Sequence, residues 1–277
     1  MIEMELHSHS CYSKGIKILH EGIGTPQQMI KQAKHVGLGA LAITDHNTVK
    51  GSLSGLKYAK QYGVIVIPGI EITSADGDIL GLDVKEHIKP YMNAEETIEK
   101  IHDMGGIAIS PHPFDIKNAG LGKLCLKADA IEVFNALSLD RFSNLKTFKI
   151  AKKYSRPMTA ASDSHALTMI GCSRTCVEAS DIGDILTEIS SGRTKLMKNY
   201  LSTRIIVDWV INRMQLSYEH SAKYIEQNYS YPKRIVANAF LNLSKRSPGK
   251  IDYLFDAMGY FAMVNAFIYG GMKYITR

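Results

Sequence analysis

Two histidines stand near the start of the chain, in the stretch MELHSHSCYSKG that covers residues 4–15. His7 and His9 are two residues apart, and residues with that spacing in a β-strand point to the same face. Two imidazoles that share a face can bind a transition metal ion such as zinc. The pair by itself also fits the wet face of an edge strand, so the rest of the chain has to decide between the two interpretations.

Further histidines and carboxylates follow apolar runs along the chain. TDHNT follows ALAI, EIT follows VIVIPGI, PHP follows IAIS, NALSLD follows IEVF, and SDSH follows PMTAA. Each apolar run is typical of a buried strand, so each polar cluster is expected at the carboxyl end of a strand. The candidate metal ligands are His7, His9, His46, Glu71, His112, Asp163 and His165.

The elements that would position these residues alternate regularly. Strands are predicted at 40–44, 63–73, 105–110, 128–134 and 156–162, and helices at 26–37, 52–63, 93–105 and 140–154. Such alternation is typical of a parallel sheet, either open or closed into a barrel. In a β/α barrel the carboxyl ends of all strands meet at one rim, where active sites are built. The candidate ligands are therefore expected to meet at that rim.

The mixture of imidazoles and carboxylates suits Zn, Mn or Fe better than Mg or Ca. Seven ligands are too many for one ion, so two or three divalent ions are expected, and a carboxylate such as Glu71 can bridge two of them. Paired ions activate a metal-bound hydroxide for attack at phosphorus, which requires no separate protein nucleophile. Taken singly, His46 and His165 could be ordinary loop residues and Asp163 a turn residue. Asp45 could orient a histidine or stabilise a turn.

The motifs HxH, TDH, GIEIT, PHP, EVFN and SDSH occur in this order over about residues 1–178. This ordered set resembles the PHP (polymerase and histidinol phosphatase) superfamily of metal-dependent phosphoesterases. The resemblance implies an α/β fold, a distorted seven-stranded β/α barrel. It implies one ion held by His7, His9, Glu71 and Asp163. It also implies a second ion on Glu71 and His112, and a third on His46 and His165.

The chain departs from this family near the third ion. Many family members carry an aspartate or a histidine where this chain has Lys14, and a lysine is a poor metal ligand but a good phosphate contact. Three alternatives remain open. The third ion could take His20 or Glu21, Lys14 could replace the ion as a fixed cation that binds substrate, or Lys14 could be a solvated loop residue.

Residues after the IEVF run are the remaining candidates for the site. Asn135 could contact the second ion or the substrate, and Arg141 could bind phosphate. Asp140 could be a ligand of the second ion or the N-cap of the following helix.

Charge divides the chain near residue 199. Residues 1–199 contain 23 Lys and Arg against 22 Asp and Glu, whereas residues 200–277 contain 10 against 5. Nine of the ten histidines precede residue 199. We therefore expect a metal-dependent phosphoesterase domain at 1–199 and an α-helical C-terminal extension at 200–277.

The extension ends in a long apolar stretch from Tyr253 to Met272, which Asp256 and Asn265 interrupt. It could pack on the barrel or on a second copy of the chain, act as a lid or contact nucleic acid, or associate weakly with a membrane. The N-terminus has no basic region followed by an apolar run, so it does not resemble a secretory signal. The four cysteines lack a zinc-ribbon spacing and are expected to be free thiols in a cytoplasmic protein.

These observations together predict a metal-dependent phosphoesterase that hydrolyses a small phosphorylated metabolite or nucleotide. The first alternative is an exonuclease that acts on short RNA or DNA ends, which the basic extension could support. The second is a non-catalytic regulatory module that retains metal ions. The near-complete set of ligands argues against this last interpretation.

Overall fold

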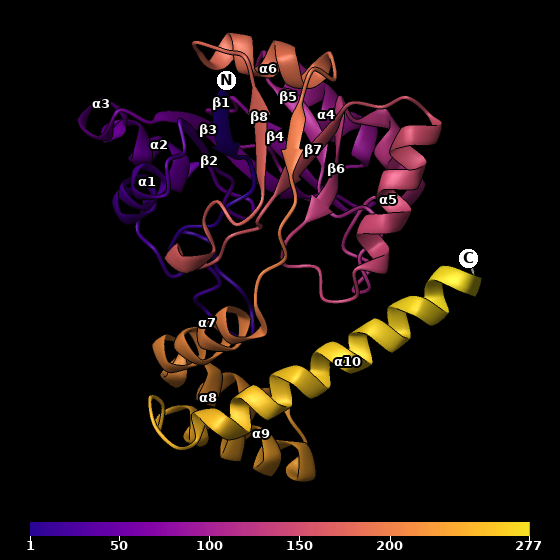
Figure 1. Cartoon of the computed structure of the whole chain (residues 1–277). Helices are drawn as coiled ribbons and strands as arrows, with labels where there is room; N and C mark the ends of the chain where they lie inside the picture. The colour runs from indigo at the N-terminus through magenta and orange to yellow at the C-terminus, as the bar shows by residue number, and fades with distance from the viewer. Residues whose placement is uncertain (277) are drawn as a thin grey trace.

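Nine β-strands form one curved sheet in the computed structural model, which describes residues 1–276 (Figure 1). In chain order they are β1 (Ile2–Glu5), β2 (Ala40–Ile43), β3 (Ile65–Thr73), β4 (Asp78–Leu82), β5 (Ile107–Ser110), β6 (Ala130–Asn135), β7 (Met158–Ala161), β8 (Arg174–Val177) and β9 (Lys195–Met197). Their order in the sheet is β7-β6-β5-β4-β3-β2-β1-β8-β9. The prediction of a β/α barrel is confirmed, but the count of seven strands is too low for residues 1–276.

Three of the nine strands run antiparallel to a neighbour and do not precede a polar cluster. β4 is antiparallel to both β3 and β5, β8 to β1, and β9 to β8. The six strands that precede the polar clusters, β1, β2, β3, β5, β6 and β7, share one direction. Since β8 and β9 have only four and three residues, neither is long enough to show a clear pattern of alternation.

Side-chain hydroxyls, rather than a backbone ladder, join the two flanks of the sheet. Thr175 on β8 accepts a hydrogen bond from the Ala160 amide of β7 at 2.9 Å and donates one to the Ala160 carbonyl at 2.8 Å. Ser162 and Ser173 exchange a similar pair at 3.0 and 3.2 Å. These side-chain hydrogen bonds link β7 to β8, which are not paired through their backbones, and nearly close the sheet into a barrel.

Helices cover the outside and one end of the barrel. Four helices follow parallel strands, namely α1 (Pro26–His35), α2 (Lys50–Leu56), α3 (Ala59–Tyr62) and α5 (Phe142–Lys153). α4 (Ala94–Asp103) follows β4, and α6 (Ile182–Ser190) follows β8. Two short 3-10 helices lie at Gly122–Lys127 and Leu167–Met169. The buried side chains of α6 join the core cluster formed by β1–β6, at the end of the barrel where the chain begins (Figure 1). The opposite rim therefore stays available for polar residues.

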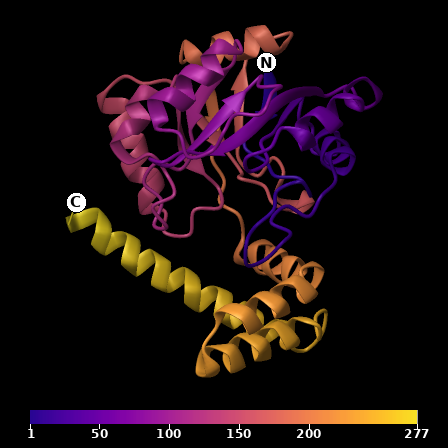
Figure 2. The ribbon, with the colours of Figure 1, turned by 180° about the vertical axis from the view of Figure 1, so that it is seen from behind.

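Four helices make up the C-terminal extension, namely α7 (Thr203–Leu216), α8 (Tyr218–Asn228), α9 (Tyr231–Ser244) and α10 (Asp252–Thr276). Both views show α7–α9 grouped beyond that rim, with α10 running from this group towards α5 (Figures 1 and 2). α10 packs on α7 and on α5. None of the helices within residues 1–276 has the length and apolar content needed to cross a membrane.

Candidate metal centre

The seven predicted ligands come together at the carboxyl ends of the parallel strands. Their ligand atoms form three overlapping groups, in each of which all atoms lie within 4.8 Å of one another. The groups are His9, His46 and His165; His7, Glu71 and His112; and His7, His9 and Asp163. Since His7 and His9 each belong to two groups, the histidine pair at the start of the chain lies at the middle of the cluster.

Glu71, on β3, is the carboxylate that touches most of the histidines. Its Oε2 lies 2.9 Å from His46 Nδ1, 3.4 Å from His9 Nε2 and 3.5 Å from His7 Nε2. Its Oε1 lies 3.3 Å from His112 Nε2. A carboxylate with each oxygen turned to a different set of imidazoles has the arrangement of a ligand that bridges two ions.

Asp163 and His112 both occupy the left-handed region of backbone conformation, at φ 54° and 29°. The Oδ1 atom of Asp163 lies 3.4 Å from His7 Nε2 and 3.3 Å from His9 Nε2. Non-glycine residues at positive φ carry a conformational cost and are concentrated at functional sites. The backbone at both positions therefore turns the side chain into the cluster at some cost in local stability.

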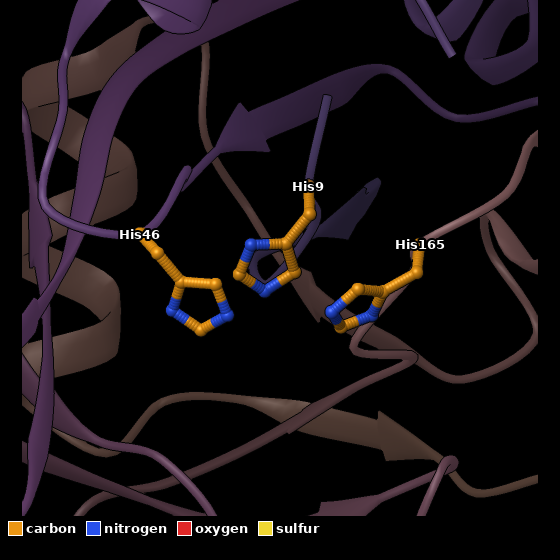
Figure 3. A group of neighbouring side chains, drawn as sticks. All are labelled: His9, His46 and His165. Atoms are coloured by element: carbon orange, nitrogen blue, oxygen red, sulfur yellow. The ribbon is translucent and has the colours of Figure 1, made fainter. Parts of the chain in front are cut away.

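Three histidines line one side of the cluster in a row, with His9 in the middle (Figure 3). The ring centroid of His9 is 4.5 Å from that of His46 and 4.2 Å from that of His165. The Nδ1 atom of His165 contacts the backbone carbonyl of Asp163 at 2.9 Å. This contact makes Nδ1 the protonated nitrogen and leaves Nε2 free as a ligand.

A buried carboxylate that sequence reasoning did not single out orients His7. Glu132, on β6, lies with its Oε1 3.1 Å from His7 Nδ1 and accepts a hydrogen bond from the His112 amide through Oε2 at 3.0 Å. Ligating histidines usually donate their second ring nitrogen to such a carboxylate, which fixes the ring and its tautomer. The signal was present in the sequence, because Glu132 lies within the EVFN motif.

His9 is held by a second chain of hydrogen bonds. Its Nδ1 lies 3.0 Å from the Ser13 hydroxyl, which donates to Asp45 at 3.0 Å. Asp45 also accepts bonds from the amide and the hydroxyl of Ser10, at 2.6 and 2.7 Å. Of the two interpretations of Asp45, the structure supports the residue that orients a histidine, and it adds Ser13 as the intermediary.

The cluster holds its histidines in two different protonation states. Burial by itself would lower the pKa of His46 and of His112, but the charge of Glu71 raises both values to about 9. Burial, together with the charge of His46, lowers the pKa of His9 to about 4 and that of His165 to about 3. The first two rings are therefore cationic at neutral pH when no metal is bound, and the other two are neutral.

Buried polar atoms without partners show that the cluster fits divalent ions. His7 Nε2, His9 Nε2, both carboxylate oxygens of Glu71, and His112 Nδ1 are buried and make no hydrogen bond. Such atoms are costly unless a ligand satisfies them. Imidazole nitrogens and carboxylate oxygens aimed at a common space are the donors that Zn, Mn and Fe prefer.

The candidates for the third ion lie on one loop but in different places: Glu21 lies at the cluster, and Lys14 and His20 lie at the surface. Glu21 Oε2 lies 3.4 Å from His46 Nε2, so Glu21 borders the group of three histidines. Lys14 and His20 instead contact each other on the exposed side of the loop, with 3.1 Å between Nζ and Nδ1.

The candidates after β6 are also placed differently from one another. Asn135 is buried and donates both amide hydrogens, to Glu132 at 2.9 Å and to Asp163 at 3.1 Å, so it positions these carboxylates. Asp140 accepts bonds from the amide and hydroxyl of Ser143 at 2.8 and 2.6 Å. It therefore caps the first turn of α5 from the position before the N-cap residue, which is Arg141. Arg141 is exposed and stacks on the Tyr200 ring at 4.6 Å.

α7 reaches the cluster from the C-terminal extension, which sequence reasoning did not foresee. The Trp209 ring lies 4.8 Å from the His165 ring, and its Nε1 donates to the Glu21 carbonyl at 2.9 Å. Arg213, one turn further along α7, stacks on Trp209 at 4.2 Å. No pattern in the sequence linked these residues to histidines more than forty positions away.

Comparison with known proteins adds the family. A family model described as PHP domain matches residues 5–228. An uncharacterized protein of Methanocaldococcus jannaschii is 38% identical over 159 residues, which cover 55% of this chain and 93% of that protein. A phosphoribosyl 1,2-cyclic phosphate 1,2-diphosphodiesterase of Eggerthella lenta is 36% identical over 92 residues, which cover 31% of this chain and 32% of that enzyme.

Two solved structures share the fold. A two-domain protein from Bacteroides vulgatus that contains a predicted PHP-like metal-dependent phosphoesterase matches with a TM-score of 0.59 and 17% identity, over 77% of this chain and 70% of that chain. PsfC from Pseudomonas syringae matches with a TM-score of 0.59 and 20% identity, over 78% of this chain and 98% of that chain.

Proposed function

This chain belongs to the PHP domain family, and from that premise we propose that it is a metal-dependent phosphoesterase that hydrolyses a small phosphorylated molecule. The observation that carries the proposal is the set of buried ligand atoms without partners on His7, His9, Glu71 and His112. A protein that kept these residues only for structure would be expected to give their buried ligand atoms hydrogen-bond partners.

Membership of the family implies that His7, His9, Glu71 and Asp163 would hold one ion, Glu71 and His112 a second, and His46 with His165 a third. The three groups of ligand atoms support this proposal, because they bring all seven residues together. His9 also contacts the pair for the third ion and Glu21 borders it, so both are available to complete it. Bound divalent ions would supply an activated water molecule and would neutralise charge on the phosphate.

The protein residues around the ions hold these ligands in place. Glu132 fixes His7, the Ser13–Asp45 pair fixes His9, and Asn135 fixes Asp163. The substrate phosphate would approach from the rim that faces α7, because α6 and the core fill the other end of the barrel.

The test combines metal analysis of the purified protein with assays on phosphomonoesters, nucleotides and labelled oligonucleotides. We expect bound divalent ions and release of inorganic phosphate from a monoester. His7→Ala should abolish the release. His102→Ala should leave it unchanged, because His102 is an exposed residue paired with Asp129 outside the cluster.

Two other results would contradict the proposal. Bound metal without hydrolysis of any compound in the panel would indicate a non-catalytic module. Shortening of oligonucleotides without hydrolysis of monoesters would indicate an exonuclease.

A further inference from the structure

A guanidinium group beside the metal centre has no carboxylate within ion-pair distance among the described residues. Arg213 on α7 is half-buried, and its Nε atom is buried without a hydrogen bond. Among the residues that the structure describes, no carboxylate forms an ion pair with it within 4.0 Å. Burial lowers the pKa of Arg213 against the opposing charge of Glu21, yet an arginine stays protonated at physiological pH.

Several other arginines pair with a carboxylate. Arg156 also keeps a buried Nε without a hydrogen bond, but its guanidinium donates to the Ala128 carbonyl. Arg204, on the same helix, contacts the carboxylates of Asp208 at 3.0 Å and Asp256 at 2.6 Å. Arg193 and Arg234 each pair with a glutamate, at 2.6 and 2.8 Å. A partly buried charge without a counter-ion is costly, so its persistence at this position indicates an anionic ligand.

The position of Arg213 relates that ligand to the metal centre. Arg213 stacks on Trp209, which contacts both His165 and the loop that carries Glu21. Trp209 and Arg213 are four residues apart, so they share one face of α7. Arg213 contacts Trp209 rather than any of the seven predicted ligands, although it lies near enough to Glu21 to be affected by its charge. The group that it binds would therefore be next to the reacting phosphate and not the reacting phosphate itself.

We propose that Arg213 binds a second phosphate group of the substrate, beside the phosphate that is hydrolysed at the metal centre. The inference rests on the proposed function and narrows its substrate class to small molecules that carry two phosphates. A planar guanidinium matches two phosphate oxygens with parallel hydrogen bonds, and a lysine cannot reproduce that match.

The chain contains a built-in reporter for the test. Trp209 is the only tryptophan among the 277 residues, and it lies between Arg213 and His165 in the series of contacts. Ligand binding at Arg213 should therefore change tryptophan fluorescence without any need for turnover. The probes are fructose 1,6-bisphosphate and fructose 6-phosphate, which differ by one phosphate, added to the metal-loaded full chain.

We expect the bisphosphate to bind about tenfold or more tightly than the monophosphate, since the second phosphate gains a charge-assisted pair. Arg213→Gln should remove this advantage, and Arg213→Lys should retain only part of it. Arg234→Gln is the matched control in the same extension and should retain all of it. Circular dichroism should show that each variant is folded.

Equal binding of the two probes by the wild type, or an undiminished preference in Arg213→Gln, would overturn the inference even if the protein hydrolyses phosphate esters. A preference that depends on Arg213 would support the inference even if no ester is turned over. Tighter Arg213-dependent binding of a dinucleotide than of the bisphosphate would overturn the small-molecule class.

A second inference concerns the side of α10 that faces away from the rest of the protein. We call it the outer face of α10, and it consists of Tyr253, Leu254, Tyr260, Phe261, Val264, Ile268, Tyr269 and Ile275. These side chains are 47–83% exposed. The opposite face of α10 is packed. Phe255 on that face is buried, an added Cβ at Gly259 would clash with α7, and one at Gly270 would clash with Asp140.

The area and charge of the outer face argue for a particular occupant. Four of its residues are aromatic and each exposes roughly 100–150 Å², so the whole face approaches the ~800 Å² per partner of a stable interface. The helix carries no charged residue between Asp256 and Lys273, so a charged partner would find no complement. An apolar helix face can pair with a copy of itself about a two-fold axis.

We propose that a second copy of this chain covers the outer face of α10. Sedimentation equilibrium of the full chain at micromolar concentration should show a dimer. Phe261→Glu combined with Ile268→Glu should give a folded monomer. Tyr91→Glu, at an equally exposed position away from α10, should remain dimeric. A wild type that stays monomeric would overturn this proposal. If that monomer co-sediments with phospholipid vesicles, the outer face of α10 contacts a lipid surface instead.

Discussion

Loading of the metal centre with divalent ions is expected to release about three protons per protein at pH 7.5. The perturbation is the addition of Zn²⁺ or Mn²⁺ to protein stripped by a chelator. The reason lies in the histidines that are cationic without metal. A metal ion binds only the neutral ring, so each protonated ligand must lose its proton first.

The magnitude follows from three rings. Although burial disfavours charge on them, Glu71 raises the pKa of His46 and of His112 to about 9. Burial likewise opposes charge on His7, but Asp163 and Glu71 raise its pKa well above the usual value. His9 and His165, with pKa values of about 4 and 3, are already neutral at pH 7.5 and release no proton when the metal binds. With about three protons displaced, the overall affinity should rise roughly a thousandfold from pH 7 to pH 8.

Isothermal titration calorimetry in two buffers of equal pH and different ionisation enthalpy measures the number of protons directly. His102→Gln, at an exposed position outside the cluster, should leave the number unchanged. An apparent enthalpy that does not depend on the buffer, or an affinity that falls between pH 7 and pH 8, would refute the assignment of cationic and neutral rings.

Three further predictions concern the support of the cluster. Glu132→Gln should lower metal affinity about 10–100-fold, because a neutral amide holds the His7 ring less firmly; competition with a chelator measures this, and unchanged affinity would contradict the role. Removal of metal with EDTA should lower the free energy of unfolding by about 3 kcal/mol, compared with protein in a free metal concentration one hundred times the dissociation constant. Scanning fluorimetry should show this as a lower Tm, and an identical Tm would show that the ions do not favour the folded state. Gly51→Ala should destabilise the protein by about 1–3 kcal/mol in urea unfolding, because the added Cβ would lie 1.8 Å from the Asp45 carboxylate; a neutral effect would mean that α2 shifts freely.

Much of the barrel was predictable from local patterns. Buried strands such as Ala40–Ile43 and Ile107–Ser110 are continuous apolar runs followed by polar residues, and helices such as Pro26–His35 begin at recognisable caps. α1 has Thr25 and Gln28 in a capping box with proline at its first position. β9 was not predictable, because its three residues owe their conformation to pairing with β8.

The residues of the site were likewise predictable only in part. The seven candidate ligands all follow or end strands that share one direction, so chain order alone predicted that they would meet at one rim. Glu132 lies within the EVFN motif but was missed, because its role shows only in its contacts with His7 and His112. Trp209 and Arg213 were missed because the path of the extension brings α7 to the rim.

The sequence by itself determined the residue types, their order and the strands that carry them, since hydrophobic periodicity and capping act over a few residues. Only the tertiary structure decided which of the polar residues face one another. Asp45, Asp140 and Asp163 are all carboxylates in polar clusters after strands, yet the first holds Ser13, the second caps α5 and the third joins the histidines. The physical reason is that the role of a buried carboxylate depends on which donors lie within about 3 Å, and the closing of the barrel sets those distances.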